Sequence, residues 1–311
     1  MNSKSIYKVN KIFVAALSYN RANIFKKSML SLVKSLIYSN AIKNAQIAVF
    51  DDGSDKTQLT IINNYCLELK NKFNLDINIH KTEKNKGYGI NYMKGVDWYI
   101  SHGGRNALLY MHETDLILEK KWFYKCNMIL NSNIKWIISP VHHINHLNFL
   151  KHANGMYNLF KENIKKTFLQ KNKIDIQEMS LREGKTVFND KSFVAKISYG
   201  LIGARLASSH YWEKVIKNKE FILSNRDKED MALSFIGKNN CVYLIPGSAK
   251  IAFKPGLHGY MFLNIASYDV GLNKFIFFVS FKRYLIKSTL KLLNKIGLIK
   301  ILKKLLKRKD G

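Results

Sequence analysis

Proline and cysteine are both scarce in this sequence. Three of each occur in 311 residues, and no stretch rich in glycine and serine interrupts the chain. Three distant cysteines without a CxxC pair exclude a disulfide framework and a cysteine metal site, which favours a reducing compartment. The shortage of prolines and linkers favours one continuous folded body over a string of small domains.

Long apolar runs are also absent. No stretch approaches the ~18–20 apolar residues that span a bilayer, and the run Ile12–Leu17 is too short for the core of a signal peptide. We therefore expect a cytoplasmic protein that is soluble or peripheral to a membrane. No GxGxxG motif follows the first predicted strand, which disfavours an NAD-binding enzyme.

Acidic residues are few, with 22 against 51 lysines and arginines, and the formal net charge is +29. Such a field attracts polyanions, including nucleic acid, anionic lipid and phosphorylated substrates. A non-enzymatic nucleic-acid-binding protein is therefore one alternative. A composition dominated by lysine, asparagine and isoleucine gives the same excess, so for most of the chain charge alone leaves both interpretations open.

The charge is most one-sided near the C-terminus, where Lys274–Arg308 contains no acidic residue. Lys287, Lys291 and Lys295 recur at every fourth position, leucine and isoleucine supply an opposing apolar side, and the aromatic run Phe275–Phe281 precedes them. This pattern predicts basic amphipathic helices over 266–311 that bind an anionic membrane surface. A partner-binding helix and a solvated tail are the alternatives.

Short apolar runs alternate with segments of helical period through the first third of the chain. The predicted strands are Lys11–Leu17, Ala45–Phe50, Asp76–His80 and Ala107–Met111. Between them, apolar residues at helical spacing, such as Phe25, Met29, Leu32 and Leu36, predict helices. Strands that alternate with helices predict an α/β fold with a mostly parallel sheet, which binds ligands at the carboxyl ends of its strands.

The rest of the chain is less regular, and no secondary structure is assigned to 139–193. Regular patterning returns at Val194–Ala204. Beyond it, helices are predicted near Ser209–Lys217 and Asp227–Ile236, and strands at Cys241–Ile245 and Lys250–Phe253.

Polar residues follow the predicted strands. Ser18–Arg21 follows the first strand and Asp51–Asp55 the second, where Asp55 is expected to cap a helix with Gln58 as its capping-box partner. His112–Asp115 follows the fourth strand and carries two carboxylates at i and i+2, a pattern that suits Mg²⁺ or Mn²⁺. Each segment also has a plain alternative as a solvated turn.

Acidic and histidine residues recur later in the chain. Glu229 and Asp230 open a helical stretch, where acids are ordinary partners of the helix dipole. His258 lies in the segment GLHGY beyond the last predicted strand. His142, His143 and His146 lack acidic neighbours and are interpreted as loop residues.

Taken in order, these segments resemble family 2 glycosyltransferases of the GT-A fold, of the type that builds bacterial cell-surface polysaccharides. The resemblance covers about residues 10 to 260 and rests on Ala16–Arg21 (a TYNR-type turn), Ile47–Thr57 (IVVDDGSTDxT), Asn85–Gly87 with Asn91 (NxGxxxAxN), Glu113–Asp115 (the metal-binding DxD) and Ser224–Gly237 (the helix that carries the ED pair). It implies a nucleotide-diphospho-sugar transferase fold, a Rossmann-like sheet flanked by helices, over 1–265.

The resemblance also implies a role for each matching residue. Tyr19 and Asp52 would contact the nucleobase, with Asp51 supporting the turn. The nucleotide-sugar site would further include Arg21, Asn85, Gly87, Asn91 and Glu113. Asp115 would bind a divalent cation, Mg²⁺ or Mn²⁺, together with His258, and Asp230 would be the general base with Glu229 beside it.

The implied reaction is inverting transfer of a sugar, from an expected UDP-sugar donor to a glycan or lipid-linked saccharide acceptor at the cytoplasmic face of the inner membrane. Nucleic acid is not an expected partner, and sugar transfer directly to a polyprenyl phosphate is an open alternative. Two residues depart from the family pattern. Leu17 stands where the family usually has threonine, and Glu113 replaces the first aspartate of DxD on a longer arm.

Overall fold

The computed structural model describes residues 11–102, 107–140, 184–198, 204–225, 229–245 and 249–251. All of them belong to one compact unit, Met1–Phe253. His258, the three histidines at 142, 143 and 146, and the predicted tail over 266–311 lie outside the described residues, so the predictions for them stand as predictions.

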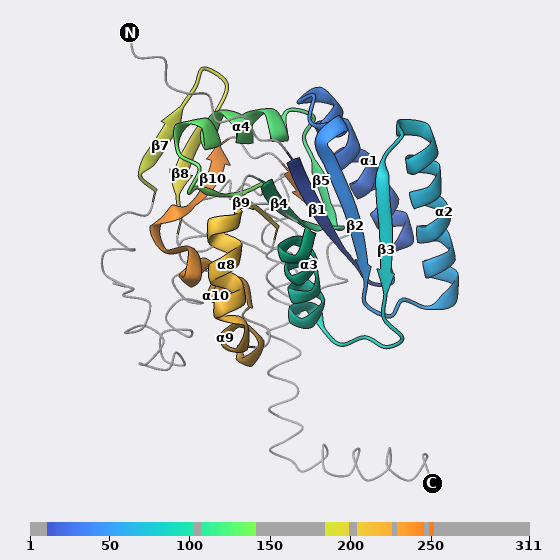
Figure 1. The fold of residues 1–311 in the computed structure, drawn as a ribbon. Coiled ribbons are helices and arrows are strands. Elements are labelled where there is room, and N and C mark those ends of the chain that lie inside the picture. Colours follow the sequence, from blue (N-terminus) through green and yellow to red (C-terminus); the bar gives the residue numbers. More distant parts are fainter. Residues whose placement is uncertain are drawn as a thin grey trace, which may run out of the picture. The chain divides into compact units, whose positions relative to one another are not determined.

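A nine-stranded sheet forms the centre of this unit (Figure 1). Its strands are β1 (Lys11–Ser18), β2 (Ala45–Asp51), β3 (Asp76–Lys81), β4 (Ala107–Glu113), β6 (Ile137–Ser139), β7 (Thr186–Asn189), β8 (Val194–Ile197), β9 (Arg205–Ser208) and β10 (Cys241–Ile245). Their order across the sheet is β3-β2-β1-β4-β9-β6-β10-β8-β7. β5 (Leu116–Leu118) and β11 (Ala249–Ile251) pair separately as a short antiparallel ribbon.

The half of the sheet built from β3, β2, β1 and β4 is parallel. β9 then runs antiparallel to β4 and β6, while β10 is parallel to β6 and antiparallel to β8. β1 is central and buried from Ile12 to Ser18, as expected of a strand covered on both faces. The predicted α/β class with a mostly parallel sheet is confirmed.

Helices cover both faces of this sheet, with α1 and α2 on one side and α3 and α8 on the other (Figure 1). The helices are α1 (Ala22–Tyr38), α2 (Lys56–Phe73), α3 (Tyr88–His102), α4 (Trp122–Ser132), α8 (Ser209–Lys217), α9 (Lys219–Ser224) and α10 (Glu229–Gly237), with single 3₁₀ turns at Ile42–Asn44 and Lys238–Asn240. The predicted apolar face of α1, Phe25, Met29, Leu32 and Leu36, is fully buried.

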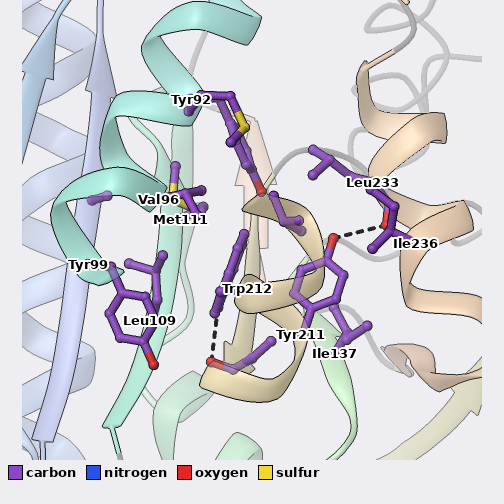
Figure 2. Close-up of a cluster of buried hydrophobic side chains, with 14 of the residues drawn as sticks. Tyr92, Val96, Tyr99, Leu109, Met111, Ile137, Tyr211, Trp212, Leu233 and Ile236 are labelled. Carbon is purple, nitrogen blue, oxygen red and sulfur yellow. Dashed lines mark hydrogen bonds between the residues drawn. The ribbon is translucent and has the colours of Figure 1, made fainter. Parts of the chain in front are cut away.

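The core between the sheet and α3, α8 and α10 fixes where α10 lies (Figure 2). Trp212 of α8 is fully buried there, and its indole N–H donates to the carbonyl of Ala207, 3.1 Å away. Tyr211 donates its hydroxyl to the carbonyl of Leu233 on α10 at 2.9 Å. α10, which carries the predicted Glu229 and Asp230, is thereby attached to the same core as β4.

Several predicted boundaries differ from the structure, and β1, β2 and β3 each end one residue later than predicted. β4 continues through His112 to Glu113 instead of ending at Met111, because Glu113 pairs in register with Leu17 of β1. The patterning at Val194–Ala204 is divided: β8 ends at Ile197, and the next described strand, β9, begins at Arg205. Within the described ranges, no helix has both the length and the apolarity that crossing a bilayer requires.

Candidate active site

The turn after β2 is organised by its own first carboxylate. Asp51 is fully buried, and its Oδ1 accepts a hydrogen bond from the backbone N–H of Ser54 at 2.8 Å. Its Oδ2 accepts the hydroxyl of Ser54 at 2.5 Å. Asp51 therefore shapes the turn internally.

Asp52 joins this turn to the loop before α3. Its Oδ1 accepts the backbone N–H of Lys86 at 3.0 Å and its Oδ2 accepts that of Gly87 at 2.9 Å. Gly87 has a φ of +95°, in the region that favours glycine. The carboxylate is 4% exposed, so its observed contacts hold the loop in shape.

Glycine is required where these two loops meet. Gly53 has a φ of +78°. A Cβ atom there would lie 2.6 Å from the carbonyl carbon of Lys84 and 2.7 Å from the backbone nitrogen of Asn85. Both neighbours are backbone atoms and cannot rotate away. The glycine of the DDGSD turn thus permits the close approach of the loop that carries Asn85 and Gly87.

The turn after β1 is connected to the same acidic turn. Asn20 has a left-handed φ of 44°, its backbone N–H donates to Oγ of Ser54 at 2.8 Å, and its side-chain oxygen accepts the N–H of Asp55 at 2.8 Å. Tyr19, next to it, is 45% exposed. The ring of Tyr19 is thus available for a ligand contact at the edge of the sheet.

The capping prediction for α2 is correct in one half and wrong in the other. Asp55 caps the helix by accepting the N–H of Gln58 at 2.9 Å. Gln58 does not complete a capping box, because its Oε1 accepts the N–H of Ala22 at 2.8 Å, at the start of α1. The N–H of Asp55 is already bonded to Asn20, so Gln58 connects two helices instead.

Asn85 and Asn91 lie in different environments. Asn85 is exposed and its Oδ1 accepts the N–H of Gly87 at 3.0 Å. Asn91 is 3% exposed, and its amide N–H donates to the carbonyl of Phe50 at 2.8 Å, while its Oδ1 has no hydrogen-bond partner. Asn91 therefore ties α3 to the end of β2, directly beneath the acidic turn.

The two carboxylates at the end of β4 face different partners. Oε1 of Glu113 accepts the hydroxyl of Tyr88 at 3.0 Å. Oδ2 of Asp115 lies 3.2 Å from Nη1 of Arg21, which follows β1. The structure therefore brings Arg21, Glu113 and Asp115 to one edge of the sheet, together with the loop that ends at Gly87.

Glu229 and Asp230 reach this edge from the first turn of α10. Glu229 is 8% exposed and packs on the backbone of Gly89, where a Cβ atom would lie 2.8 Å from its Oε1. Oδ1 of Asp230 lies 3.5 Å from the hydroxyl of Tyr88. The side chain of Asp230 is 26% exposed. Asp230 thus borders the sheet edge and is accessible to a substrate.

Two residues of this site were missed in the sequence analysis, Tyr88 and Arg205. Tyr88 is the first residue of α3, and its hydroxyl contacts both Glu113 and Asp230. Arg205 is fully buried on β9, and its Nη2 lies 3.8 Å from Oδ1 of Asp230. A lone arginine in the otherwise buried strand RLAS was a usable signal, because buried charges need partners.

Burial and neighbouring negative charges shift the pKa values of Glu113 and Tyr88. Removal from water, followed by the charges of Asp230 and Asp115, raises the pKa of Glu113 well above its usual range. Burial, followed by the same effect of Asp230 and Glu113, raises the pKa of Tyr88, which stays protonated and can donate. The residues described at this site therefore include more carboxylates than cationic side chains.

The oxygen donors at the end of β4 are of the kind that Mg²⁺ and Mn²⁺ prefer. Glu113 and Asp115 supply two carboxylates at one sheet edge. Within the described ranges, no group of three or more histidine, cysteine, aspartate or glutamate side chains forms a metal cluster. The residues present thus fit a cation that takes its remaining ligands from a bound molecule.

A mostly parallel α/β sheet, acidic turns at its strand ends and a helix acid opposite them define a glycosyltransferase of the GT-A fold. The profile of the family described as Glycosyl transferase family 2 matches residues 14–193, more than half of the chain. The protein belongs to this family.

Several solved structures are similar to this chain at low identity. TarS 1–349 of S. aureus in complex with UDP-GlcNAc is 13% identical with a TM-score of 0.50, and the match covers 80% of this chain and 61% of that one. GalNAc-T7 with UDP, GalNAc and Mn²⁺ is 12% identical with a TM-score of 0.44, covering 76% and 42%. The chain thus spans about three-fifths of the TarS fragment. No curated protein matches the sequence significantly.

Proposed function

We propose that this glycosyltransferase inverts the anomeric carbon as it moves a sugar from a nucleotide diphosphate, a UDP-sugar first among candidates, to a glycan or lipid-linked saccharide of the cell surface. One observation carries the proposal. The acid at the end of β4 and the acid of α10 meet at a single hydroxyl, that of Tyr88, although Asp230 lies 142 residues along the chain from it. The site thus has an acid on the donor side and a second acid opposite.

Asp230 acts as the general base. Its carboxylate takes the proton of the acceptor hydroxyl while that oxygen bonds to the anomeric carbon, and the bond to the nucleoside diphosphate breaks. A positioned base of this kind contributes roughly 10²–10⁴-fold to the rate. Its 26% exposure supports this role, because an acceptor must reach it. Glu229, packed on Gly89, holds the first turn of α10 beside the donor loop.

The donor site consists of the loops that meet at the sheet edge. Tyr19 offers an exposed ring for the nucleobase, and Asp51 and Asp52 hold the turn and the loop against which the nucleotide binds. The loop residues Asn85 and Gly87, supported by Asn91 below, line the same site. Arg21 approaches the diphosphate.

The divalent cation, Mg²⁺ or Mn²⁺, belongs at Asp115 with Glu113 nearby and His258 as a further ligand. When bound, it supplies positive charge that stabilises the departing diphosphate. The family resemblance and the oxygen-only donor set at the end of β4 support this assignment.

The test is turnover of nucleotide sugars by the wild type and by Asp230→Asn. We expect UDP with Mn²⁺ to raise the melting temperature of both proteins, because the substitution leaves the donor loops intact. We expect transfer to fall at least roughly 100-fold in the variant. Near-normal turnover in Asp230→Asn contradicts the base assignment. A wild type that neither binds nor turns over any nucleotide sugar contradicts the whole proposal.

The tail over 266–311 is proposed to bring the enzyme to the cytoplasmic face of the inner membrane, where a lipid-linked acceptor lies. Its run of lysines without acidic residues supports attraction to anionic lipid. Deleting Lys274–Gly311 is expected to abolish binding to anionic vesicles while donor hydrolysis persists. Equal binding of both proteins to anionic and neutral vesicles contradicts this proposal.

A further inference from the structure

A fully buried guanidinium holds the first turn of α10. Nη2 of Arg205 lies 3.3 Å from the carbonyl oxygen of Asp230 and 3.8 Å from Oδ1 of the same residue. Nη1 donates to the hydroxyl of Tyr211 at 3.2 Å, and that hydroxyl donates to the carbonyl of Leu233. Arginine stays charged even when buried. One cation therefore contacts the backbone and the side chain of Asp230 and, through Tyr211, the next turn of the helix.

The hydroxyl of Tyr88 approaches Asp230 from α3. It lies 3.5 Å from Oδ1 of Asp230 and donates to Oε1 of Glu113 at 3.0 Å. The residue before it, Gly87, is held by Asp52 in the donor loop. The ring centroids of Tyr88 and Tyr92 are 5.6 Å apart. Tyr92 belongs to the buried core, and Tyr88 packs against that core. Its hydroxyl is thus carried on a fixed ring at the junction of the donor loop and α10.

Both groups approach the same oxygen of Asp230. Arg205 belongs to β9 and Tyr88 to α3, so the contacts reach Oδ1 from two independent elements. A carboxylate restrained at one oxygen cannot rotate freely about its side-chain bonds. The two contacts, at 3.5 Å from Tyr88 and 3.8 Å from Arg205, therefore favour one orientation of the Asp230 side chain.

We propose that Arg205 and Tyr88 are positioning residues that clamp Oδ1 of Asp230 and so fix the orientation of the general base. This inference rests on the proposed function, in which Asp230 takes the acceptor proton. Because catalytic groups lose roughly 10²-fold when displaced by about 1 Å, the clamp acts on the turnover number. Its effect on the affinity for the donor is expected to be smaller, because Asp230 acts on the acceptor in the proposed reaction.

The first test is Tyr88→Phe, which removes only the hydroxyl. We expect kcat to fall roughly 10- to 100-fold, with a smaller change in KM for the nucleotide sugar. Tyr99→Phe is the matched control. It lies on the same helix and also loses a buried hydroxyl bond, 2.9 Å to the carbonyl of Ala107, but it is remote from Asp230. The control is expected to keep kcat.

The second test is the pair Arg205→Lys and Arg205→Met. Lysine keeps the charge, so we expect it to retain more of kcat than methionine does. Both variants are compared at temperatures below their own melting transitions, which separates loss of activity from loss of fold. If neither variant nor Tyr88→Phe lowers kcat, or if the losses appear in KM for the donor alone, the clamp is overturned.

The outcomes separate this inference from the proposed function. An inactive wild type, or an active Asp230→Asn, overturns the assignment of the base, and the clamp falls with it. An active wild type with an impaired Asp230→Asn and a fully active Tyr88→Phe overturns the clamp alone. A reduced kcat in Asp230→Asn and in Tyr88→Phe, with a normal kcat in Tyr99→Phe, supports both the base assignment and the clamp.

Discussion

Nη1 of Arg21 lies 3.2 Å from Oδ2 of Asp115, and this ion pair joins the ends of β1 and β4. The same carboxylate is the one assigned to the divalent cation. A guanidinium at this position offsets its charge and opposes the approach of a metal ion. We therefore expect Arg21 and the proposed cation to compete for Asp115 until a diphosphate offers Arg21 another partner.

Replacing Arg21 by methionine should tighten the binding of Mn²⁺ to the nucleotide-free protein. Removing one positive charge at ion-pair distance is worth about 1 kcal/mol at a partly exposed site, or several-fold in affinity. Isothermal titration with MnCl₂ measures the change. Lys219→Met is the control, because it breaks the exposed pair with Asp97 and removes the same charge elsewhere. Equal affinities in all three proteins contradict the competition.

Replacing Glu113 by glutamine should stabilise the metal-free protein and impair transfer. The folded pKa of Glu113 is raised by burial and by Asp230 and Asp115. For an acid this means that stability is lost as pH rises from the unfolded pKa towards the folded one. At neutral pH the substitution therefore removes a destabilising contribution.

Chemical unfolding in EDTA at pH 7 and pH 4 checks this expectation. The gain should be present at pH 7 and nearly absent at pH 4, below the unfolded pKa. Glu68→Gln, on the exposed face of α2, is the surface control and should change stability at neither pH. A loss of stability in Glu113→Gln at pH 7 would show that the ionised carboxylate of Glu113 does not destabilise the fold.

His112 should make the fold sensitive to mild acid. It is fully buried between Oγ of Ser28, 2.8 Å from Nε2, and the hydroxyl of Tyr110, 3.2 Å from Nδ1. Burial lowers the pKa of His112 to about 3. Because the folded pKa lies below the unfolded one, stability is full above about pH 6.5 and falls below it, by up to about 1.4 kcal/mol per pH unit.

Unfolding free energies between pH 7 and pH 5 measure this slope. His112→Asn should be less stable at pH 7 but should lose less on acidification than the wild type. If the unfolding free energies of the wild type and His112→Asn change equally with pH, His112 is not the cause of the acid sensitivity.

Two glycines of α3 should respond differently to alanine. At Gly95 a Cβ atom would lie 2.9 Å from Cβ of Ala15 and 3.0 Å from Cε of Met111, so α3 must move off the sheet. The helix propensity gained, about 1 kcal/mol, is smaller than the overpacking cost of about 1–3 kcal/mol. At Gly89 the nearest atom is Oε1 of Glu229, the end of a flexible side chain.

We therefore expect Gly95→Ala to lower the melting temperature and leave kcat nearly intact. Gly89→Ala should keep stability and lower kcat, because it displaces Glu229 beside Asp230. Thermal unfolding and steady-state kinetics on both variants give the comparison. The same effect of both variants on both quantities would contradict the distinction.

The sequence was informative where a residue's role depends on its neighbours along the chain. The buried strands, the helix face of Phe25 and Met29, and the polar turns after β1, β2 and β4 follow from local period and composition. Parallel strands bring such turns to one edge, and the structure places Arg21 and Asp115 together there.

Contacts between segments that are distant along the chain could not be predicted from local sequence patterns. Gln58 has the spacing of a capping-box partner, yet it caps α1, since the approach of α1 is set by tertiary packing. Tyr88 looks like an ordinary residue at a helix start, and only the packing of α10 against α3 brings its hydroxyl to Asp230. Arg205 was visible as an anomaly, but its partner was not.

The bonds from Asp52 to the amides of Lys86 and Gly87 affect how mutants at this position are interpreted. A loop already ordered by the protein need not be ordered by the ligand, so part of the entropic cost of binding is met during folding. An Asp52→Asn variant would disorder that loop and weaken nucleotide binding even without touching the base. Loss of affinity in that variant would therefore measure how much the ordered loop contributes to nucleotide binding.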